Sequence, residues 1–195
     1  MPRWIAAVAM LAVASAAQAA LRVTVASHPE GSVWTLRTTL EPAGTSLRGM
    51  PLSRFDPAWC AADELTADAF PAALHDTGEW PLGGAAGREG RFAVAGDFGS
   101  GRYLELFLGV YRQCDGQRRT FLAVRDPAAA DGAGGIVQVE TLTAGDAAVL
   151  HLLGEPGGDG FRVRSCVACD DEGQHFLWDE RARRFSPQPH EERDI

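Results

Sequence analysis

Two apolar segments that meet at an Asp-Gly pair restrict the fold more than any other feature of this chain. The segments are Tyr103–Gln113 and Arg118–Arg125, with Asp115 and Gly116 between them. Asp-Gly favours the positive φ angles of a type I′ hairpin turn. Both faces of the hairpin are largely apolar, so we expect it to lie centrally and to be covered on both sides. A turn centred on Asp115-Gly116 predicts four cross-strand pairs: Val110 with Phe121, Leu108 with Ala123, Phe107 with Val124, and Tyr111 with Thr120.

Further short segments of strand-forming residues alternate with turns rich in glycine and proline. The first two flank a turn at His28-Pro29-Glu30-Gly31, and the last two form a predicted hairpin of Gln174–Trp178 with Arg184–Phe185. This pattern predicts an all-β fold, mainly an antiparallel sandwich or a barrel. The other expected strands are Leu21–Ala26, Val33–Leu40, Arg91–Gly96, Ile136–Leu142, Ala147–Leu153 and Phe161–Val167.

One short helix is expected at residues 61–70, where alanine, leucine and early acidic residues end at Pro71. Residues 41–57 and 78–90 are rich in glycine and proline and are predicted to be loops. A chain of 195 residues suits one domain. We place that domain at residues 20–186 and expect a flexible polar tail at residues 187–195.

The first nineteen residues have the layout of a secretory signal peptide. Arg3 gives a positive start, an apolar run follows from Ile5 to Ala17, and Ala17-Gln18-Ala19 is a typical cleavage signature. The apolar run is short for a membrane span. We therefore expect a signal helix that is cleaved near Ala19, a periplasmic or extracellular location, and no membrane insertion afterwards.

The four cysteines are Cys60, Cys114, Cys166 and Cys169. An exported chain with an even number of cysteines is expected to form disulfides, and four cysteines allow three pairings. We favour Cys60–Cys114 and Cys166–Cys169. The first bond would join the expected helix to the end of the central hairpin.

Two other interpretations of the cysteines remain open. A thioredoxin-like pair at Cys166 and Cys169 needs a helix N-terminus, but three carboxylates follow Cys169 and would raise the pKa of its thiol. A metal site would combine this pair with His175 and either Cys114 or His151, which is an incomplete ligand pattern. Structural disulfides are the favoured interpretation.

The net charge of the chain and its lack of lysine exclude several functions. The formal net charge is −8, which disfavours nucleic-acid binding. Every basic residue other than histidine is arginine. Schiff-base chemistry, pyridoxal phosphate enzymes and the Walker A nucleotide site all need lysine and are therefore excluded. We expect no cofactor.

Residues 96–112 begin Gly-Asp-Phe-Gly-Ser-Gly-Arg and run into an expected strand. This segment resembles the turn of FG-GAP or VCBS-type repeats, a family in which aspartates form a calcium loop. The resemblance implies Asp97 and Glu105 as calcium ligands. Ser100 stands where the family has a second acid, and calcium needs six or more oxygens. The ligand count therefore favours a glycine-rich turn without metal.

Candidate functional side chains are few. Trp80, Trp178 and Phe176 are candidates for a binding surface, because aromatic residues are common in interaction hot spots. Burial at the ends of a sandwich is the competing interpretation for these three, as it is for Trp59 and Phe185. Asp63, Glu64 and Asp68 are more typical of a solvated helix face than of a glycosidase acid pair.

No G-x-S-x-G or H-E-x-x-H motif occurs in the sequence. The sequence therefore favours an exported, non-catalytic binding protein, such as an inhibitor or immunity-like partner of an exported enzyme. The alternative is a hydrolase whose residues converge only in the folded chain.

Overall fold

The computed structural model describes residues 21–30, 33–69, 92–129, 135–142, 152–153, 160–164 and 173–188. These residues form β-strands in antiparallel sheets with almost no helix, which confirms the expected all-β, sandwich-like fold. Within these ranges, no helix has the length and apolar character needed to cross a membrane. The predicted signal peptide, the loop at 78–90 and the end of the tail lie outside the described residues.

The central sheet contains the predicted hairpin and three strands beside it. Its order is β5-β7-β8-β9, and β6 also pairs with β7. β5 pairs with one half of β7 and β6 with the other half, so both lie along the same edge of that strand. The strands are β5 (Trp59–Glu64), β6 (Ala93–Gly96), β7 (Leu104–Gln113), β8 (Arg118–Asp126) and β9 (Gly135–Thr141).

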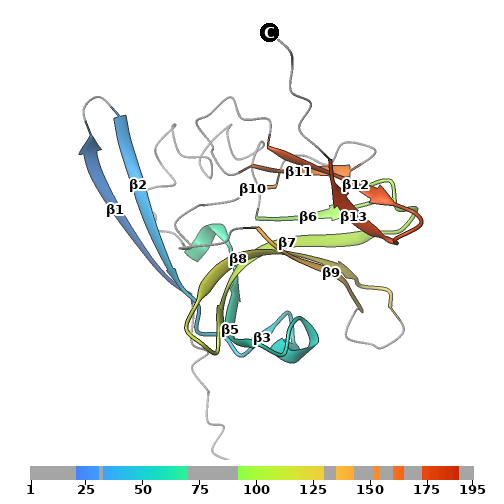
Figure 1. The fold of residues 1–195 in the computed structure, drawn as a ribbon, viewed down its shortest axis with the longest axis horizontal. Helices are drawn as coiled ribbons and strands as arrows, with labels where there is room; N and C mark the ends of the chain where they lie inside the picture. Colours follow the sequence, from blue (N-terminus) through green and yellow to red (C-terminus); the bar gives the residue numbers. More distant parts are fainter. Residues whose placement is uncertain are drawn as a thin grey trace, which may run out of the picture.

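The other strands form one four-stranded sheet and two hairpins. The four-stranded sheet has the order β10-β11-β12-β13, and the pairs β1–β2 and β3–β4 are separate. In Figure 1 the four-stranded sheet lies above the central sheet, and β3 with the 3₁₀ turn η1 lies below it. The bounds are β1 (Arg22–Glu30), β2 (Val33–Glu41), β3 (Ser46–Leu47), β4 (Met50–Pro51), η1 (Leu52–Arg54), η2 (Ala67–Ala69), β10 (Leu152–Leu153), β11 (Gly160–Arg164), β12 (Gln174–Asp179) and β13 (Arg184–Pro187).

Alternation along β7 and β8 sends apolar side chains into two separate cores. Leu106, Leu108 and Val110 face the core shared with the four-stranded sheet, where Phe161 and Phe185 pack. On the opposite face, a second core is closed by β3, η1 and the start of β5. Its members are Leu47, Leu52, Trp59, Ala62, Phe107, Tyr111, Phe121 and Ala123. The expectation of a hairpin covered on both sides is thus confirmed.

The register of the central hairpin differs from the predicted one by a single residue. Leu108 pairs with Leu122, and Val110 pairs with Thr120. The turn has three residues rather than two: Gly116 N–H donates to the carbonyl of Gln113 over 2.9 Å, and Gly116 has φ 94°. This is a turn followed by a glycine in the left-handed region, the usual three-residue hairpin loop.

The shifted register explains the glycine in the middle of β7. Phe121 lies opposite Gly109, not opposite Val110 as predicted. A Cβ atom at Gly109 would collide with the Phe121 ring and would lie 2.6 Å from the carbonyl oxygen of Asp63. Glycine is therefore required where an aromatic ring and a neighbouring strand approach the same backbone position.

The predicted helix at 61–70 is wrong. Residues Trp59–Glu64 form β5, and only the short η2 turn lies in the remainder of that segment. β5 pairs with β7, and its Cys60 is bonded to Cys114 at the end of that strand. Sheet pairing and the disulfide thus outweigh the modest helix propensity of alanine and leucine.

Two further boundaries differ from the sequence prediction. Residues 41–57, predicted to be a loop, contain β3, β4 and η1. β1 continues to Glu30, which pairs with Val33, so residues 28–30 belong to a strand rather than to a turn. The remaining expected strands agree in place with β6, β9, β10, β11, β12 and β13 where the structure describes them.

The Cys60–Cys114 disulfide confirms the favoured pairing for these two cysteines. It closes a sequence separation of 54 residues and joins β5 to the turn after β7. A disulfide is compatible with an extracellular or periplasmic protein. Cys166 and Cys169 lie outside the described residues, so their pairing stays a prediction.

One side chain connects the two large sheets. The Phe185 N–H of β13 donates to Gln138 Oε1 over 2.8 Å, and Gln138 Nε2 donates to the Phe185 carbonyl over 2.9 Å. The Gln138 amide of β9 therefore pairs with a strand backbone as a neighbouring peptide would. It satisfies two polar groups at the edge of the four-stranded sheet.

We expect the Cys60→Ala/Cys114→Ala double variant to unfold about 2–5 kcal/mol more easily than the wild type, because the bond restricts the unfolded chain. Urea unfolding of the oxidised proteins measures this difference. A loss below about 0.5 kcal/mol, the range of neutral surface substitutions, would contradict it.

Replacement of Gln138 by alanine should lower the free energy of unfolding by about 1–3 kcal/mol, because it leaves two backbone groups of Phe185 unsatisfied. Gln117→Ala is the matched control, since that exposed side chain accepts from Arg119 and has no other hydrogen bond within the described part of the chain. Urea unfolding of both variants is the measurement. Equal stability of the two variants would show that the Gln138 bridge contributes little.

Candidate functional site

The acidic residues that the sequence offered as a catalytic pair have structural roles or lie apart. Asp63 Oδ2 accepts hydrogen bonds from the backbone N–H groups of Ala43 and Gly44, at 2.6 and 3.1 Å. Glu64 binds Arg48, and Asp68 is exposed on η2. Asp63 thus holds the chain before β3 against β5. The three residues do not converge on one site.

Arg48 occupies an unusual backbone position in the turn between β3 and β4. Arg48 has φ 49° and Gly49 has φ 78°, while Leu47 and Met50 pair on either side. Two positive φ angles in a two-residue loop are the signature of a type I′ turn, where asparagine and glycine are favoured. Arginine at this position carries a conformational cost, so its side chain has to compensate.

The compensation comes from a half-buried charge network. Arg48 binds Glu64 through two nitrogens, at 2.9 Å from Nε and 2.5 Å from Nη2, and its Nη1 donates to Glu105 over 2.8 Å. Its guanidinium carbon lies 4.1 Å from the centre of the Phe107 ring. Arg125 approaches the same Glu105 at 3.5 Å. Bidentate pairing and ring stacking are the contacts that arginine makes better than lysine.

The electrostatics of this network favour the charged form of Arg48. The hydrogen bonds that Arg48 donates to Glu64 raise the pKa of Arg48 above its ordinary value, burial opposes this, and the charges of Glu64 and Glu105 reinforce the rise. A folded-state pKa above the unfolded value means that the stabilisation is complete below the unfolded pKa. As pH rises through the folded pKa, in strongly alkaline solution, this contribution of Arg48 is lost.

The network binds its carboxylates tightly and leaves little for chemistry. Glu64 and Glu105 are both engaged by arginine, and the part of the chain that the structure describes has no group of three potential metal ligands. The network therefore acts as a clip. It fastens the β3–β4 turn over Phe107 and the second core.

The segment with the calcium-loop resemblance lies between β6 and β7. Asp97 Oδ1 accepts the N–H of Gly101 over 3.0 Å, and Ser100 Oγ bonds with the backbone of Arg102 in both directions. Glu105, the second expected ligand, belongs to the Arg48 network. Both candidate carboxylates thus have protein donors, and the favoured interpretation, a glycine-rich turn without metal, stays a prediction.

The metal interpretation of the cysteines loses one of its ligands. Cys114 is bonded to Cys60, so its sulfur is not available as a thiolate. His175 lies half-buried in β12. Cys166, Cys169 and His151 lie outside the described residues.

The aromatic candidates separate into core and edge positions. Phe176 is only 3% exposed and stacks on Phe161 at 5.1 Å, so it belongs to the core and not to a binding surface. Trp59 and Phe185 are buried as well. Trp178 is half-buried at the edge of the four-stranded sheet, and Trp80 lies outside the described residues.

Trp178 has a cation beside it. The guanidinium carbon of Arg102 lies 5.7 Å from the Trp178 ring centre, within the range of a cation–π contact. Arg102 also pairs with Asp126 over 3.0 Å. The buried Nε1 of Trp178 has no hydrogen-bond partner in the described chain. Tyr103, the next residue after Arg102, is 61% exposed.

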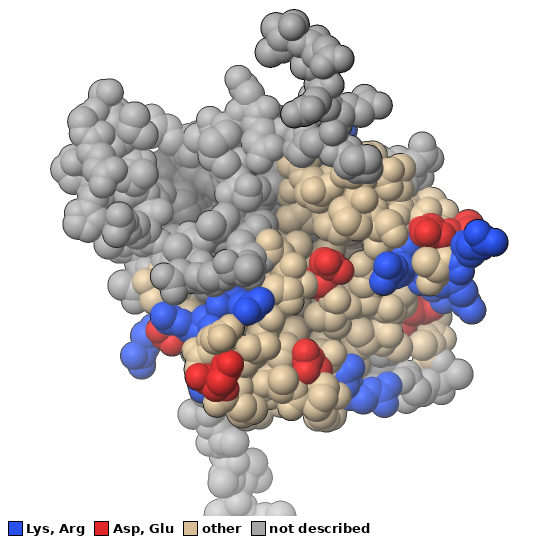
Figure 2. Space-filling view, viewed as in Figure 1, with Lys and Arg blue, Asp and Glu red and all other residues tan. Residues whose placement is uncertain are grey.

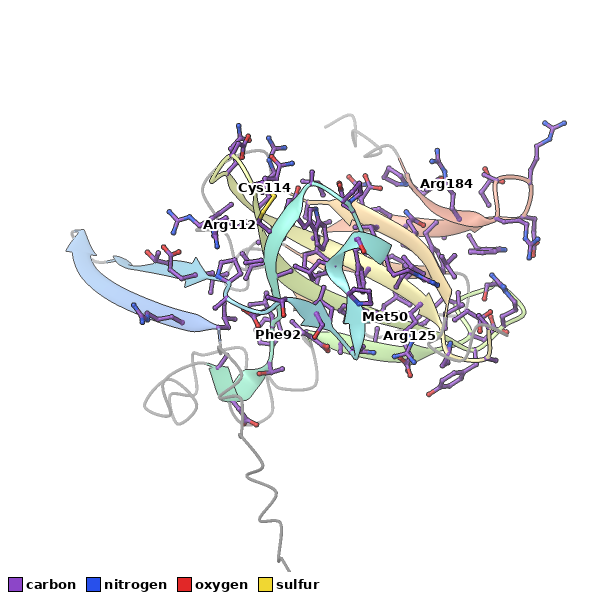
Figure 3. All side chains as sticks on the ribbon, turned by 90° about the horizontal axis from the view of Figure 1, so that it is seen from below. Met50, Phe92, Arg112, Cys114, Arg125 and Arg184 are labelled. Carbon is purple, nitrogen blue, oxygen red and sulfur yellow. A yellow bond between two sulfur atoms is a disulfide. The ribbon has the colours of Figure 1, made fainter. Side chains whose placement is uncertain are left out.

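Beyond Trp178, the turn between β12 and β13 presents Arg181, Arg183 and Arg184, which we call the arginine end. All three are exposed, and no ion pair involves them in the described part of the chain. Figure 2 shows the gathering of arginine at this end of the molecule, next to acidic side chains. In Figure 3, Arg184 and Arg112 lie toward opposite ends of the molecule.

The arginine end is held in one shape by its own turn. Asp179 Oδ1 accepts the N–H groups of Arg181 and Ala182, both at 2.9 Å. Arg183 has φ 52°, and Arg184 pairs with Asp179 across the hairpin. Asp179 therefore acts as a capping residue. The exposed arginines stand on a defined backbone.

The sequence reasoning missed Arg48, Arg102 and the arginine end. The run Asp-Glu-Arg-Ala-Arg-Arg at residues 179–184 was a visible signal, because three arginines in four residues within a hairpin turn cannot all be buried. No comparable local signal marks Arg48, whose partners are distant in sequence.

No protein-family model, curated protein or solved structure matches this chain.

We expect Arg48→Asn to lower the free energy of unfolding by about 1–3 kcal/mol, although asparagine suits the turn better than arginine. The loss arises because two half-buried glutamates lose their main donor. Urea unfolding measures it, with Arg119→Asn as the control at a position whose side chain binds only Gln117 among described partners. An Arg48→Asn variant as stable as the wild type would refute a stabilising role for the clip.

Proposed function

We propose that this chain is an exported, non-catalytic binding protein, an inhibitor or immunity-like partner of an exported enzyme. It docks through the arginine end and the neighbouring Arg102 and Trp178. The observation that carries the proposal is the arginine end itself. Three exposed arginines without ion pairs in the described chain stand on a capped turn.

The chemistry of this surface supports binding. Arginine, tryptophan and tyrosine dominate protein interaction hot spots. Arg102 contacts Trp178, which directly precedes Asp179 in the sequence, and the exposed Tyr103 follows Arg102. A turn that is already ordered loses less conformational entropy when a partner binds. The surface therefore combines suitable residue types with a prepared backbone.

The internal charges support a role without catalysis. Asp63, Glu64 and Glu105 fasten the segment before β5 and the β3–β4 turn. A general acid or base has to exchange a proton with substrate, which carboxylates committed to such contacts do poorly. These three carboxylates instead hold neighbouring segments of the fold together.

Export is part of the proposal. The N-terminal layout is that of a cleaved signal peptide, with cleavage near Ala19. The Cys60–Cys114 disulfide suits an oxidising compartment. The mature chain would then meet its partner in the periplasm or outside the cell.

Capture from the periplasmic and extracellular fractions of the native cells tests the proposal. The full chain, exported with its own N-terminal segment, should retain a reproducible partner that mass spectrometry identifies. The Arg181→Ala/Arg183→Ala/Arg184→Ala variant should lose that partner. The Arg22→Ala/Arg112→Ala/Arg119→Ala variant, which removes the same charge elsewhere, should keep it.

The circular dichroism spectrum and melting temperature of both variants have to match those of the wild type. Absence of any reproducible partner would refute the binding function. A partner that both variants retain would support binding but would refute the arginine end as its site.

A further inference from the structure

We infer that the arginine end binds clustered carboxylates on an acidic protein segment, an inference that rests on the binding function proposed above. The relevant groups are the guanidinium forks of Arg181, Arg183 and Arg184. Each fork offers parallel N–H donors that match a carboxylate in a bidentate way. The occupant is thus a polypeptide rich in aspartate or glutamate.

The arginine end differs from four arginines that fasten the fold. Arg48, Arg102, Arg118 and Arg125 each have a carboxylate from a distant part of the described chain. At the arginine end, Asp179 accepts backbone N–H groups of the turn. The exposed Glu180 beside Arg181 forms no ion pair within the described part of the chain. The turn therefore uses its own acid to fix the backbone, and the guanidinium groups stay available.

The local geometry favours recognition of several carboxylates together. Arg184 lies in β13 opposite Asp179, while Arg181 and Arg183 lie in the turn itself. The left-handed backbone of Arg183, φ 52°, is held between the capped turn and the strand pair. Because the backbone that carries these arginines is already ordered, only their side chains have to be ordered when they meet a matching set of acceptors.

The charge of the whole chain favours an acidic protein segment over nucleic acid. The formal net charge is −8, so a long polyphosphate that extends beyond the turn meets an acidic surface. A duplex carries about one charge per 1.7 Å of axis, which a single turn cannot neutralise over any length. A short acidic segment needs only the local field, because charges beyond about 8 Å are screened at physiological salt.

Trp178 and Arg102 extend the same surface with contacts that suit a polypeptide. Arg102 lies over the Trp178 ring, and Trp178 is the residue that directly precedes Asp179. The half-buried ring of Trp178 offers apolar area, and the exposed arginines beside it offer positive charge. This combination is typical of protein interfaces with a few dominant residues.

Direct binding measurements test the inference with defined probes. The wild-type full chain, exported and purified, is titrated against a short poly-L-glutamate, poly-L-lysine, heparin and single-stranded DNA at one fixed salt concentration. We expect binding to poly-L-glutamate. Arg181→Glu/Arg183→Glu/Arg184→Glu should weaken it by about tenfold or more, since it opposes like charges.

Two further variants separate recognition by arginine from charge alone. The triple lysine variant at the same positions keeps the charge but not the bidentate fork, and should bind more weakly than the wild type. Arg22→Glu/Arg112→Glu/Arg119→Glu makes the same charge change on β1, β7 and β8, and should retain most of the affinity.

Three results would overturn the inference: no binding to poly-L-glutamate, tighter binding to heparin or DNA than to poly-L-glutamate, or equal losses in the two charge-reversed variants. Failure of the inference is distinguishable from failure of the binding function. A partner captured from native fractions that survives charge reversal at the arginine end refutes only the inference, whereas absence of any captured partner refutes the binding function.

Discussion

The whole structure depends on the β7–β8 hairpin having two apolar faces. Leu106, Leu108 and Val110 point to one core, and Phe107 and Tyr111 point to the other. Burial of one large apolar side chain contributes roughly 1.5–3 kcal/mol, so neither face can be left in water. The four-stranded sheet covers one face, and the β3–β4–η1 segment covers the other. The layered arrangement in Figure 1 is therefore a direct consequence of one hairpin.

The segments that cover these faces are too short to hold themselves in place. β3 and β4 have two residues each, and an isolated two-stranded hairpin is marginal in water. Polar contacts supply the missing attachment. Arg48 clips the β3–β4 turn to Glu64 and Glu105, and the Gln138 amide joins β9 to β13. Arg48 adopts an unfavourable backbone conformation in this contact. The stabilisation from its side-chain contacts therefore outweighs the conformational cost at this turn position.

Patterns that are local in the sequence predicted the fold well, and contacts between distant residues account for most of what was missed. The central hairpin follows from its apolar segments and its Asp-Gly pair. Its register differs by one because a two-residue and a three-residue loop can share that pair. A type I′ turn would give both Asp115 and Gly116 positive φ angles, whereas here only Gly116 of the two has one. Residues 61–70 are predicted to be helical because propensity takes no account of sheet partners. The expected bond between Cys60 and Cys114 already placed this segment beside the central hairpin. The predicted surface residue Phe176 is buried because the alternation of β12 points it at Phe161. Trp178, two residues further on the same face, is half-buried and packs against Phe185. Arg48 could not be found this way, since its partners lie 16 and 57 residues away.

The arginine end is the part of the described structure that folding itself does not explain. The chain has 26 acidic residues and 18 basic ones, so arginines are not left unpaired for lack of carboxylates. Elsewhere the fold uses arginine to fasten one segment to another, as Arg48 and Arg102 do. At the arginine end Asp179 binds backbone N–H groups instead, and the exposed Glu180 has no ion pair with described residues. Three like charges on one turn repel each other, and a counterion of matching geometry removes that cost. A partner with carboxylates would neutralise these three arginines. The two cores, the Arg48 network and the Gln138 bridge stabilise the domain without them.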